Sequence, residues 1–453
     1  MKDNHEQLTL DFFLDDTDDA NQSEPAGATI FSAKKEKRRT FPSDLVNDFE
    51  QYINYILKHP MELTKTKAYI PSKQLPDLNS LLSIKAKNKT NRPQQEQYPY
   101  IHFLYHLALA SRILEKAPIT ANQLKLQGTN RWMQFQKLTF TEKYFVLLET
   151  FWVDANWAKM LGEHRNQIHH MFATVCKQLL DDKQIDFGSK TMLANLTRCW
   201  NHFFLHIEWF GFWVCEKDQE QIDKYGKKND FYAKSISLTP FGENMLRILL
   251  ESRDITVWNI PLRVEYGEVN PVPGSALPDM PSEKRTVNKK KPEAFHHAFD
   301  GLFPKRDLSQ TLPRDSGTYT PGLYTFHVMW HVKVWRKITI SSEHTMQDLH
   351  KAIIQAFNFD DEHLYSFFMD GEKWSPNCIA SPNDDSGANA ANIQIGSAGL
   401  HEGQHFMYLY DYGDEWIFTV TLENIAPLEG EPTAPVIIAE KGSAPEQYWD
   451  EEY

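Results

Sequence analysis

The sequence has few cysteines and no long apolar run. Its four cysteines, Cys176, Cys199, Cys215 and Cys378, are irregularly spaced, which argues against the disulfide framework of a small secreted protein. No apolar stretch approaches the ~20 residues that a membrane-spanning helix needs. The acidic N-terminus also lacks the basic and apolar regions of a signal peptide. We therefore expect a cytoplasmic protein with no membrane partner.

Two common catalytic motifs are also missing from the sequence. It contains no glycine-rich phosphate loop and no Gly-x-Ser-x-Gly nucleophile elbow. The usual nucleotide-dependent and hydrolase chemistries therefore have no support. We predict no cofactor and no metal, and the sequence indicates no specific reaction.

Charge is present but unevenly distributed. The chain carries −13 in total, and residues 301–453 hold 9 basic and 23 acidic groups, which is 9 − 23 = −14. The first thirty residues carry one lysine and eight acids, so residues 31–300 are net +8. A basic middle between acidic ends is typical of a segment that faces nucleic acid, although ordinary surface variation explains it equally well.

A length of 453 residues predicts two to four domains. Residues 1–40 read as a disordered acidic tail with a basic end, and 41–265 as a helical region. Residues 266–318 read as a linker, because proline is dense over 271–292. Residues 319–453 read as a compact module of strands and one helix, with a polar loop over 377–398. The predicted fold class is a multidomain α+β protein with mainly antiparallel strands in its C-terminal part.

The helical region ends in a change of hydrophobic period. Helices are predicted over 43–57, 100–116, 141–161, 164–181 and 189–206, and strands over 207–215 and 231–238 with a charged turn between them. Ser43, Thr139 and Thr239 are predicted N-caps, and Pro240 opens a final helix.

This order of elements resembles the winged-helix class over residues 141–252. The resemblance implies that the helix 189–206 enters a DNA groove and that the charged turn forms the wing. The candidate DNA contacts are Lys190, Arg198, Lys224, Lys227 and Lys228. Acidic residues on the same turn leave a second interpretation open, in which this unit binds only protein.

The C-terminal module contains five ordered motifs. They are Val334-Trp335-Arg336-Lys337, Thr345-Met346 with Leu349-His350 and Ala356-Phe357, the segment 361–367, the segment 408–416, and the segment 441–448. Together they resemble the plasmid pRiA4b ORF-3-like family. The resemblance implies an α+β fold, an association with plasmids and insertion elements, and no established biochemical activity.

The polar residues of these motifs form the candidate functional surface: Arg336, His350, His363, Tyr410, Asp411, Asp414, Trp416 and Glu446. Histidine and aspartate could hold a divalent metal or act as an acid–base pair. They could equally cap turns and pair with Arg336 to fix the fold. Many relatives have a histidine where this chain has Phe418, which removes one possible ligand. We favour a structural or partner-binding role.

The N-terminal tail carries one pointed motif. Gln7, Leu8, Leu10 and Phe12 resemble a bacterial sliding-clamp-binding peptide, in which a glutamine and spaced apolar side chains fill a groove. The alternative is a terminal segment that docks on the protein itself.

Two sets of histidines are weighed as metal ligands and assigned to packing instead. Cys199, His202, His206 and Cys215 lie among aromatic residues, so a buried core is favoured over zinc. The histidine pair at 102 and 106 lacks a third ligand and reads as part of a helix face.

The sequence as a whole predicts a non-enzymatic adaptor that brings the C-terminal module to DNA or to a replication complex. A metal-dependent enzyme that uses His363, Asp411 and Asp414 is one alternative. A scaffold that binds only proteins is the other.

Overall fold

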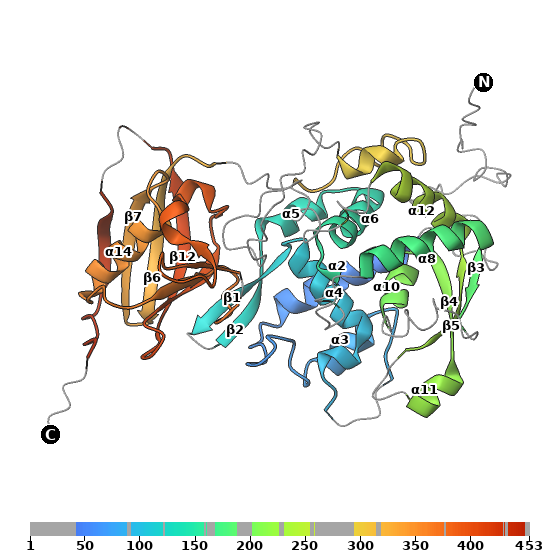
Figure 1. The fold of residues 1–453 in the computed structure, drawn as a ribbon, viewed down its shortest axis with the longest axis horizontal. Helices are drawn as coiled ribbons and strands as arrows, with labels where there is room; N and C mark the ends of the chain where they lie inside the picture. The colour runs from blue at the N-terminus through green and yellow to red at the C-terminus, as the bar shows by residue number, and fades with distance from the viewer. Residues whose placement is uncertain are drawn as a thin grey trace.

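The computed structural model describes residues 42–87, 92–120, 123–157, 160, 168–187, 202–225, 231–253, 258, 294–313, 319–375, 377–428, 430 and 434–448. These residues form two lobes, one from the N-terminal part of the chain and one from residues 319–448 (Figure 1). Within the described part of the chain, no helix has both the length and the apolar character needed to cross a membrane.

The N-terminal lobe is mainly helical and has two small antiparallel sheets. Its elements are α2 Ser43–Lys58, α3 Leu75–Leu81, η1 Gln95–Gln97, α4 Pro99–Ala110, β1 Leu114–Thr120, β2 Gln123–Gly128, α5 Asn130–Gln136, α6 Phe140–Glu149, the π-helix η2 Thr150–Asp154, α8 Ile168–Asp182, β3 Gln184–Asp186, α10 Phe203–Trp209, β4 Trp213–Lys217, α11 Gln219–Tyr225, β5 Ala233–Leu238, α12 Pro240–Ser252 and η5 Phe295–Phe299.

A dense aromatic core holds this lobe together. Trp152, Trp157, Phe172 and Trp258 are almost fully buried, with ring centroids 5.1–6.3 Å apart. Aromatic side chains bury large areas, and pairs at this spacing add to the stability that burial gives. The segment 294–313 joins this core through Phe295, Phe299, Phe303, Leu308 and Leu312. The second half of the range predicted as a linker therefore packs against the N-terminal lobe.

The C-terminal lobe is one sheet with strand order β10-β9-β8-β11-β12-β6-β7-β13. Its pairs are antiparallel except β10 with β9. The elements are β6 Leu323–His331, β7 Val334–Ser341, α14 Met346–Phe357, β8 Tyr365–Phe368, β9 Cys378–Ala380, β10 Ala388–Asn389, η6 Ala390–Asn392, η7 Ile395–Ser397, β11 His405–Tyr410, β12 Trp416–Ala426 and β13 Val436–Lys441.

Helix α14 covers one face of this sheet (Figure 1). Its buried residues Leu349, Ile353 and Phe357 recur at helical spacing and join a core with Phe326, Ile338 and Phe406. The mixed architecture with mainly antiparallel strands confirms the predicted α+β class.

Local signals set several helix starts. The side chains of Thr139 and Thr345 accept from the third backbone amide of their helices, and Glu142 and Asp348 complete the two capping boxes. Thr239 caps α12 by accepting from Gly242 N, as predicted. The prediction that Ser43 is an N-cap is wrong, because Pro42 occupies the N-cap position and Ser43 is the first helical residue.

Two of the long predicted helices were wrong in extent. The helix over 100–116 ends at Ala110, since Arg112 adopts φ 56° and the chain turns into β1. The helix over 141–161 changes at Thr150 into a π-helix that ends at Asp154. The hairpin β1–β2 was not predicted. The helix over 189–206 falls largely outside the described residues.

The strand predicted over 207–215 was also wrong in its first half. Residues 207–209 close α10, and Gly211 at φ 82° reverses the chain before β4 begins at Trp213. The preference of aromatic residues for strands reflects how they pack on the surface of a sheet. Here the same residues are buried in the core of a helical lobe, so that preference does not decide their structure. Helix α11 occupies part of the charged segment expected to be a turn. The loop expected over 377–398 contains β9, β10, η6 and η7.

Candidate functional site

Arg336 is a buried structural residue. Its Nε donates to the carbonyl of Ala356 at 2.9 Å, and its Nη1 lies 2.9–3.1 Å from the carbonyls of Trp335, Lys441 and Gly442. The guanidinium also stacks over Phe357, 4.8 Å from the ring centroid. Arg336 therefore ties β7 to the end of α14 and to the segment after β13, and it is not available to a ligand.

His350 lies in the core beneath the sheet. Its Nδ1 is 2.7 Å from the Tyr408 hydroxyl and its Nε2 is 2.6 Å from Asp361 Oδ1. Because the Asp361 carboxylate can only accept, Nε2 donates to it, and Nδ1 of the neutral ring then accepts the hydroxyl proton of Tyr408. The imidazole stacks flat on Tyr365, with centroids 3.6 Å apart. Burial lowers the pKa of His350 to about 4, against the opposing effect of Asp361.

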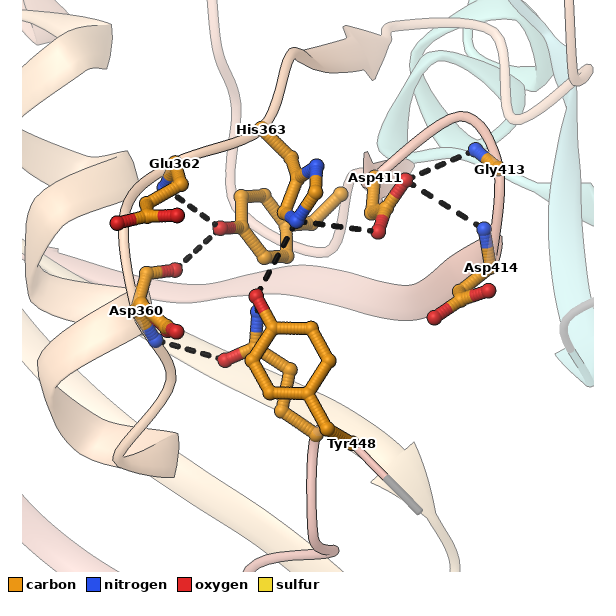
Figure 2. Close-up of polar contacts among 9 residues, drawn as sticks. Asp360, Glu362, His363, Asp411, Gly413, Asp414 and Tyr448 are labelled. Carbon is orange, nitrogen blue, oxygen red and sulfur yellow. Dashed lines mark hydrogen bonds and ion pairs between the residues drawn. The ribbon is translucent and has the colours of Figure 1, made fainter. Parts of the chain in front are cut away.

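The most open part of the predicted surface centres on His363. Its Nε2 lies 3.2 Å from the Tyr448 hydroxyl and 3.5 Å from Asp411 Oδ2 (Figure 2). Tyr448 is about half exposed, whereas Asp411 is nearly buried. The structure thus brings the predicted pair His363 and Asp411 together, and adds Tyr448, which the predicted site did not include.

Asp411 also stabilises the turn between β11 and β12. It adopts φ 56°, and its Oδ1 accepts from the backbone amides of Gly413 and Asp414 at 2.9 and 3.4 Å. This is the turn-capping role that short acidic side chains perform. The side chain of Asp414 is exposed, and its backbone amide is what contacts Asp411 (Figure 2).

The remaining predicted residues support the same corner of the domain. The Tyr410 hydroxyl donates to the carbonyl of Asp360 and accepts from the amide of Glu362 at 3.2 Å. Gln447, which the prediction left out, accepts from the Asp360 amide at 2.7 Å. Trp416 packs on Phe359 and Trp330, and Glu446 is exposed.

The position of the family histidine is filled by a core residue. Phe418 is 1 % exposed, packs against Phe357 at 4.8 Å and lies 5.6 Å from Tyr408. The substitution therefore contributes an apolar side chain to the core and no ligand to the site.

The candidate contacts of the N-terminal lobe can be placed only in part. Lys224 lies on α11 with an exposed side chain. Lys190, Arg198, Lys227 and Lys228 lie outside the described residues. The tail residues Gln7, Leu8, Leu10 and Phe12 also lie outside them.

The two histidines of α4, His102 and His106, are buried, and the hydrogen bonds of His102 fix its tautomer. Gln95 accepts from the Ile70 amide through Oε1 at 2.8 Å, so its amide nitrogen donates to His102 Nδ1 at 3.1 Å. The proton of neutral His102 is then on Nε2, which lies 3.2 Å from His106 Nε2. A protonated Nε2 cannot bind a metal ion. Burial lowers the pKa of His102 to about 4.

The prediction of no metal overlooked one short match. His401, Glu402 and His405 have the spacing H-E-x-x-H, which binds zinc when a helix places both histidines on one face. Here the segment is a turn with Gly403 at φ 82°, and it leads directly into β11. His405 Nδ1 bonds Thr421 Oγ1 at 2.7 Å. Among the described residues, no three His, Cys, Asp or Glu side chains converge on a metal position.

Comparison with known proteins places the C-terminal motifs. Residues 328–449 match the family model "Plasmid pRiA4b ORF-3-like protein". The C-terminal domain is similar to this family. This confirms the resemblance carried by the motifs between 334 and 448, and the match lies wholly within that domain.

The chain was also compared with curated proteins and with solved structures. No curated protein matches the chain. One similar solved structure is a protein of unknown function, MM3350, from Methanosarcina mazei Go1. It is 27% identical over 28% of this chain and 72% of that chain, with a TM-score of 0.24.

Proposed function

We propose that the protein is a non-enzymatic adaptor whose N-terminal lobe contacts DNA and whose pRiA4b-type domain binds a protein partner. The observation that carries the proposal is the order β3-β5-β4 in the small sheet of the N-terminal lobe. Helix α8 precedes β3, α10 precedes β4, and β5 pairs with both other strands. A helix followed by two paired strands that share their sheet with an earlier strand is the order of elements expected of a winged helix, and this order supports the proposal.

Charge supports the DNA part of the proposal. Residues 31–300 carry net +8, and the candidate recognition segment contains Lys190 and Arg198. Basic side chains that neutralise phosphates release counterions, which gives affinity without base recognition. The wing carries lysines and acids together, so we assign most of the contact to Lys190 and Arg198.

The internal bonding of the C-terminal motifs supports binding rather than catalysis. The polar atoms of Arg336, His350 and Tyr410 form hydrogen bonds inside the domain. What remains on the surface is His363 with Tyr448, Asp414 and Glu446, and these side chains suit a protein partner. The sliding clamp is a second proposed partner, through Gln7, Leu8, Leu10 and Phe12.

A salt-resolved titration tests the DNA proposal. Full-length protein is titrated with fluorescent duplex DNA at several salt concentrations, beside a Lys190→Ala/Arg198→Ala variant. The variant should bind more weakly, and the slope of log affinity against log salt should fall by about 2, since each lost phosphate contact removes about 0.9.

The matched control is Lys333→Ala/Lys351→Ala, which removes two exposed lysines from the acidic domain. It should bind as the wild type does. Absence of binding even at low salt would overturn the DNA proposal and favour a scaffold that binds only proteins.

A metal-dependent enzyme is the weaker proposal. It rests on the His363–Asp411 pair, in which Asp411 already uses Oδ1 to cap its turn. If the purified protein contains a metal, and a correctly folded His363→Ala variant does not, the enzyme proposal would be favoured over the adaptor proposal.

A further inference from the structure

The hairpin β1–β2 extends from the N-terminal lobe to the C-terminal sheet, where β1 lies against β11 (Figure 1). Its base is fixed in the N-terminal lobe, because Leu114 and Leu126 are buried in that core and Gly128 packs against Leu57. Strands β1 and β2 pair from Leu114 with Gly128 to Thr120 with Gln123. The hairpin is therefore an arm of the first lobe that contacts the second.

Two neighbouring side chains of β1 make the contact. Lys116 forms an ion pair with Glu372, and Glu115 Oε2 lies 3.3 Å from His401 Nε2. Successive side chains of a strand point to opposite faces. Since both reach the C-terminal lobe, β1 lies between the loop that carries Glu372 and the turn that carries His401.

The two lobes keep separate apolar cores among the described residues. The buried cluster of the first lobe runs from Leu45 to Leu312, and the clusters of the second include residues from 324 onward only. An interface without a shared apolar core resembles a transient one, and salt screens its exposed charge pairs more than its partly buried ones. Lys116 is 10 % exposed and Glu372 27 % exposed, so this pair is the more protected part of the contact.

We propose that Lys116 and Glu372 form an electrostatic latch that holds the C-terminal domain docked on the β1–β2 arm. When the latch is weakened, the two lobes undock. Arg131 Nη1 donates to the carbonyl of Pro313 at 2.5 Å, so the chain is still held on the first lobe as far as Pro313. Undocking frees both the arm and the face of the sheet at β11.

Small-angle X-ray scattering of the full-length protein tests the latch. Wild type should be compact at about 0.05 M NaCl and stay largely compact at about 1 M NaCl, because a partly buried pair is screened much less than an exposed one. Lys116→Glu and Glu372→Lys should each be expanded already at low salt. The expected rise in the radius of gyration is roughly a tenth of the ~22 Å typical of a compact chain of this length.

A charge-swap variant gives the most direct test of the ion pair. The Lys116→Glu/Glu372→Lys double variant should return to the compact radius, because it restores an opposite pair in the reverse orientation. Lys337→Glu is the matched control: Lys337 pairs with Glu423 at 2.7 Å inside the C-terminal lobe, so its loss should leave the radius unchanged.

Two results would overturn the latch. They are an unchanged radius in both single variants and a double variant that stays expanded. Circular dichroism of each variant separates undocking from unfolding, since undocking leaves the secondary structure intact.

Discussion

At the scale of single residues, the polar motif residues of the C-terminal domain serve mainly its own backbone. Arg336 joins three segments, His350 links Tyr408 to Asp361, and Asp411 caps a turn. Buried polar groups of this kind are stable only when every partner is present. Substitution should therefore be felt first in stability.

Arg336→Lys should destabilise the C-terminal domain by about 1–3 kcal/mol, the range for leaving a buried hydrogen-bonding group without its partner. A lysine carries the charge but lacks the planar fork that reaches several carbonyls at once. Urea unfolding of wild type and variant measures the difference. Lys337→Arg, on the exposed side of the same strand, should change little, and a loss below about 1 kcal/mol for Arg336→Lys would contradict this role.

Acid should destabilise the same domain through His350. Its pKa is lowered to about 4 in the fold by burial, against about 6.5 in the unfolded chain. Between these values the unfolded state binds more protons, so stability is lost as the pH falls from about 6.5 towards 4, by up to about 3 kcal/mol.

Unfolding free energies at several pH values measure this effect. His350→Gln should lower the stability at neutral pH but flatten its dependence on pH, whereas His331→Gln, at an exposed site, should preserve the slope. An unaltered slope in His350→Gln would mean that another group carries the acid response.

At the scale of elements, the start of α12 is fixed by close packing against the segment before β4. Thr239 donates to the carbonyl of Gly211 at 2.7 Å and caps Gly242. A Cβ built on Gly242 would lie 1.8 Å from the carbonyl oxygen of Phe212. The threonine and the glycine of this short motif are thus required by one contact between two elements.

Gly242→Ala should displace α12 and destabilise the N-terminal lobe by about 3 kcal/mol or more, as overpacking against rigid backbone does. Gly301→Ala is the matched control, because a Cβ there meets nothing within 4 Å. Thermal unfolding followed by circular dichroism compares the two. Equal midpoints for both variants would show that the helix shifts without cost.

At the scale of the whole molecule, the two separate apolar cores predict two unfolding transitions. Calorimetry of the full-length protein should resolve them, since a single cooperative transition requires a shared core. His350→Gln should shift one transition and Gly242→Ala the other. One transition that moves equally with either substitution would contradict the independence of the lobes.

Prediction from sequence succeeded best in the C-terminal domain. Its strands at 323–331, 334–341 and 416–426 and its helix α14 follow the simple periods of 2 and 3.6, and Thr345 marks the helix start. In the N-terminal lobe the aromatic run 207–215 was divided between a helix and a strand, and the hairpin β1–β2 was missed. A run that is apolar on all sides carries no period, so its form depends on what packs around it.

The candidate site was predicted as a set of residues but not as an arrangement. Arg336 and His350 could be recognised as motif members, yet only the fold shows that they face inward. Gln447 and Tyr448 belong to the fifth motif but were not assigned to the site, because they meet Asp360 and His363 across more than eighty residues of sequence.

The sequence by itself determined the helix caps at Thr139 and Thr239, the acidic character of residues 301–453, the periodic elements of the C-terminal domain and its family motifs. These features are local, so neighbouring residues suffice to fix them. The tertiary structure alone decided which polar side chains are buried, which histidines lose their basicity, and that β1 meets Glu372 and His401. Those properties depend on distances between segments far apart in the chain, and burial, pKa and ion pairing follow from the distances.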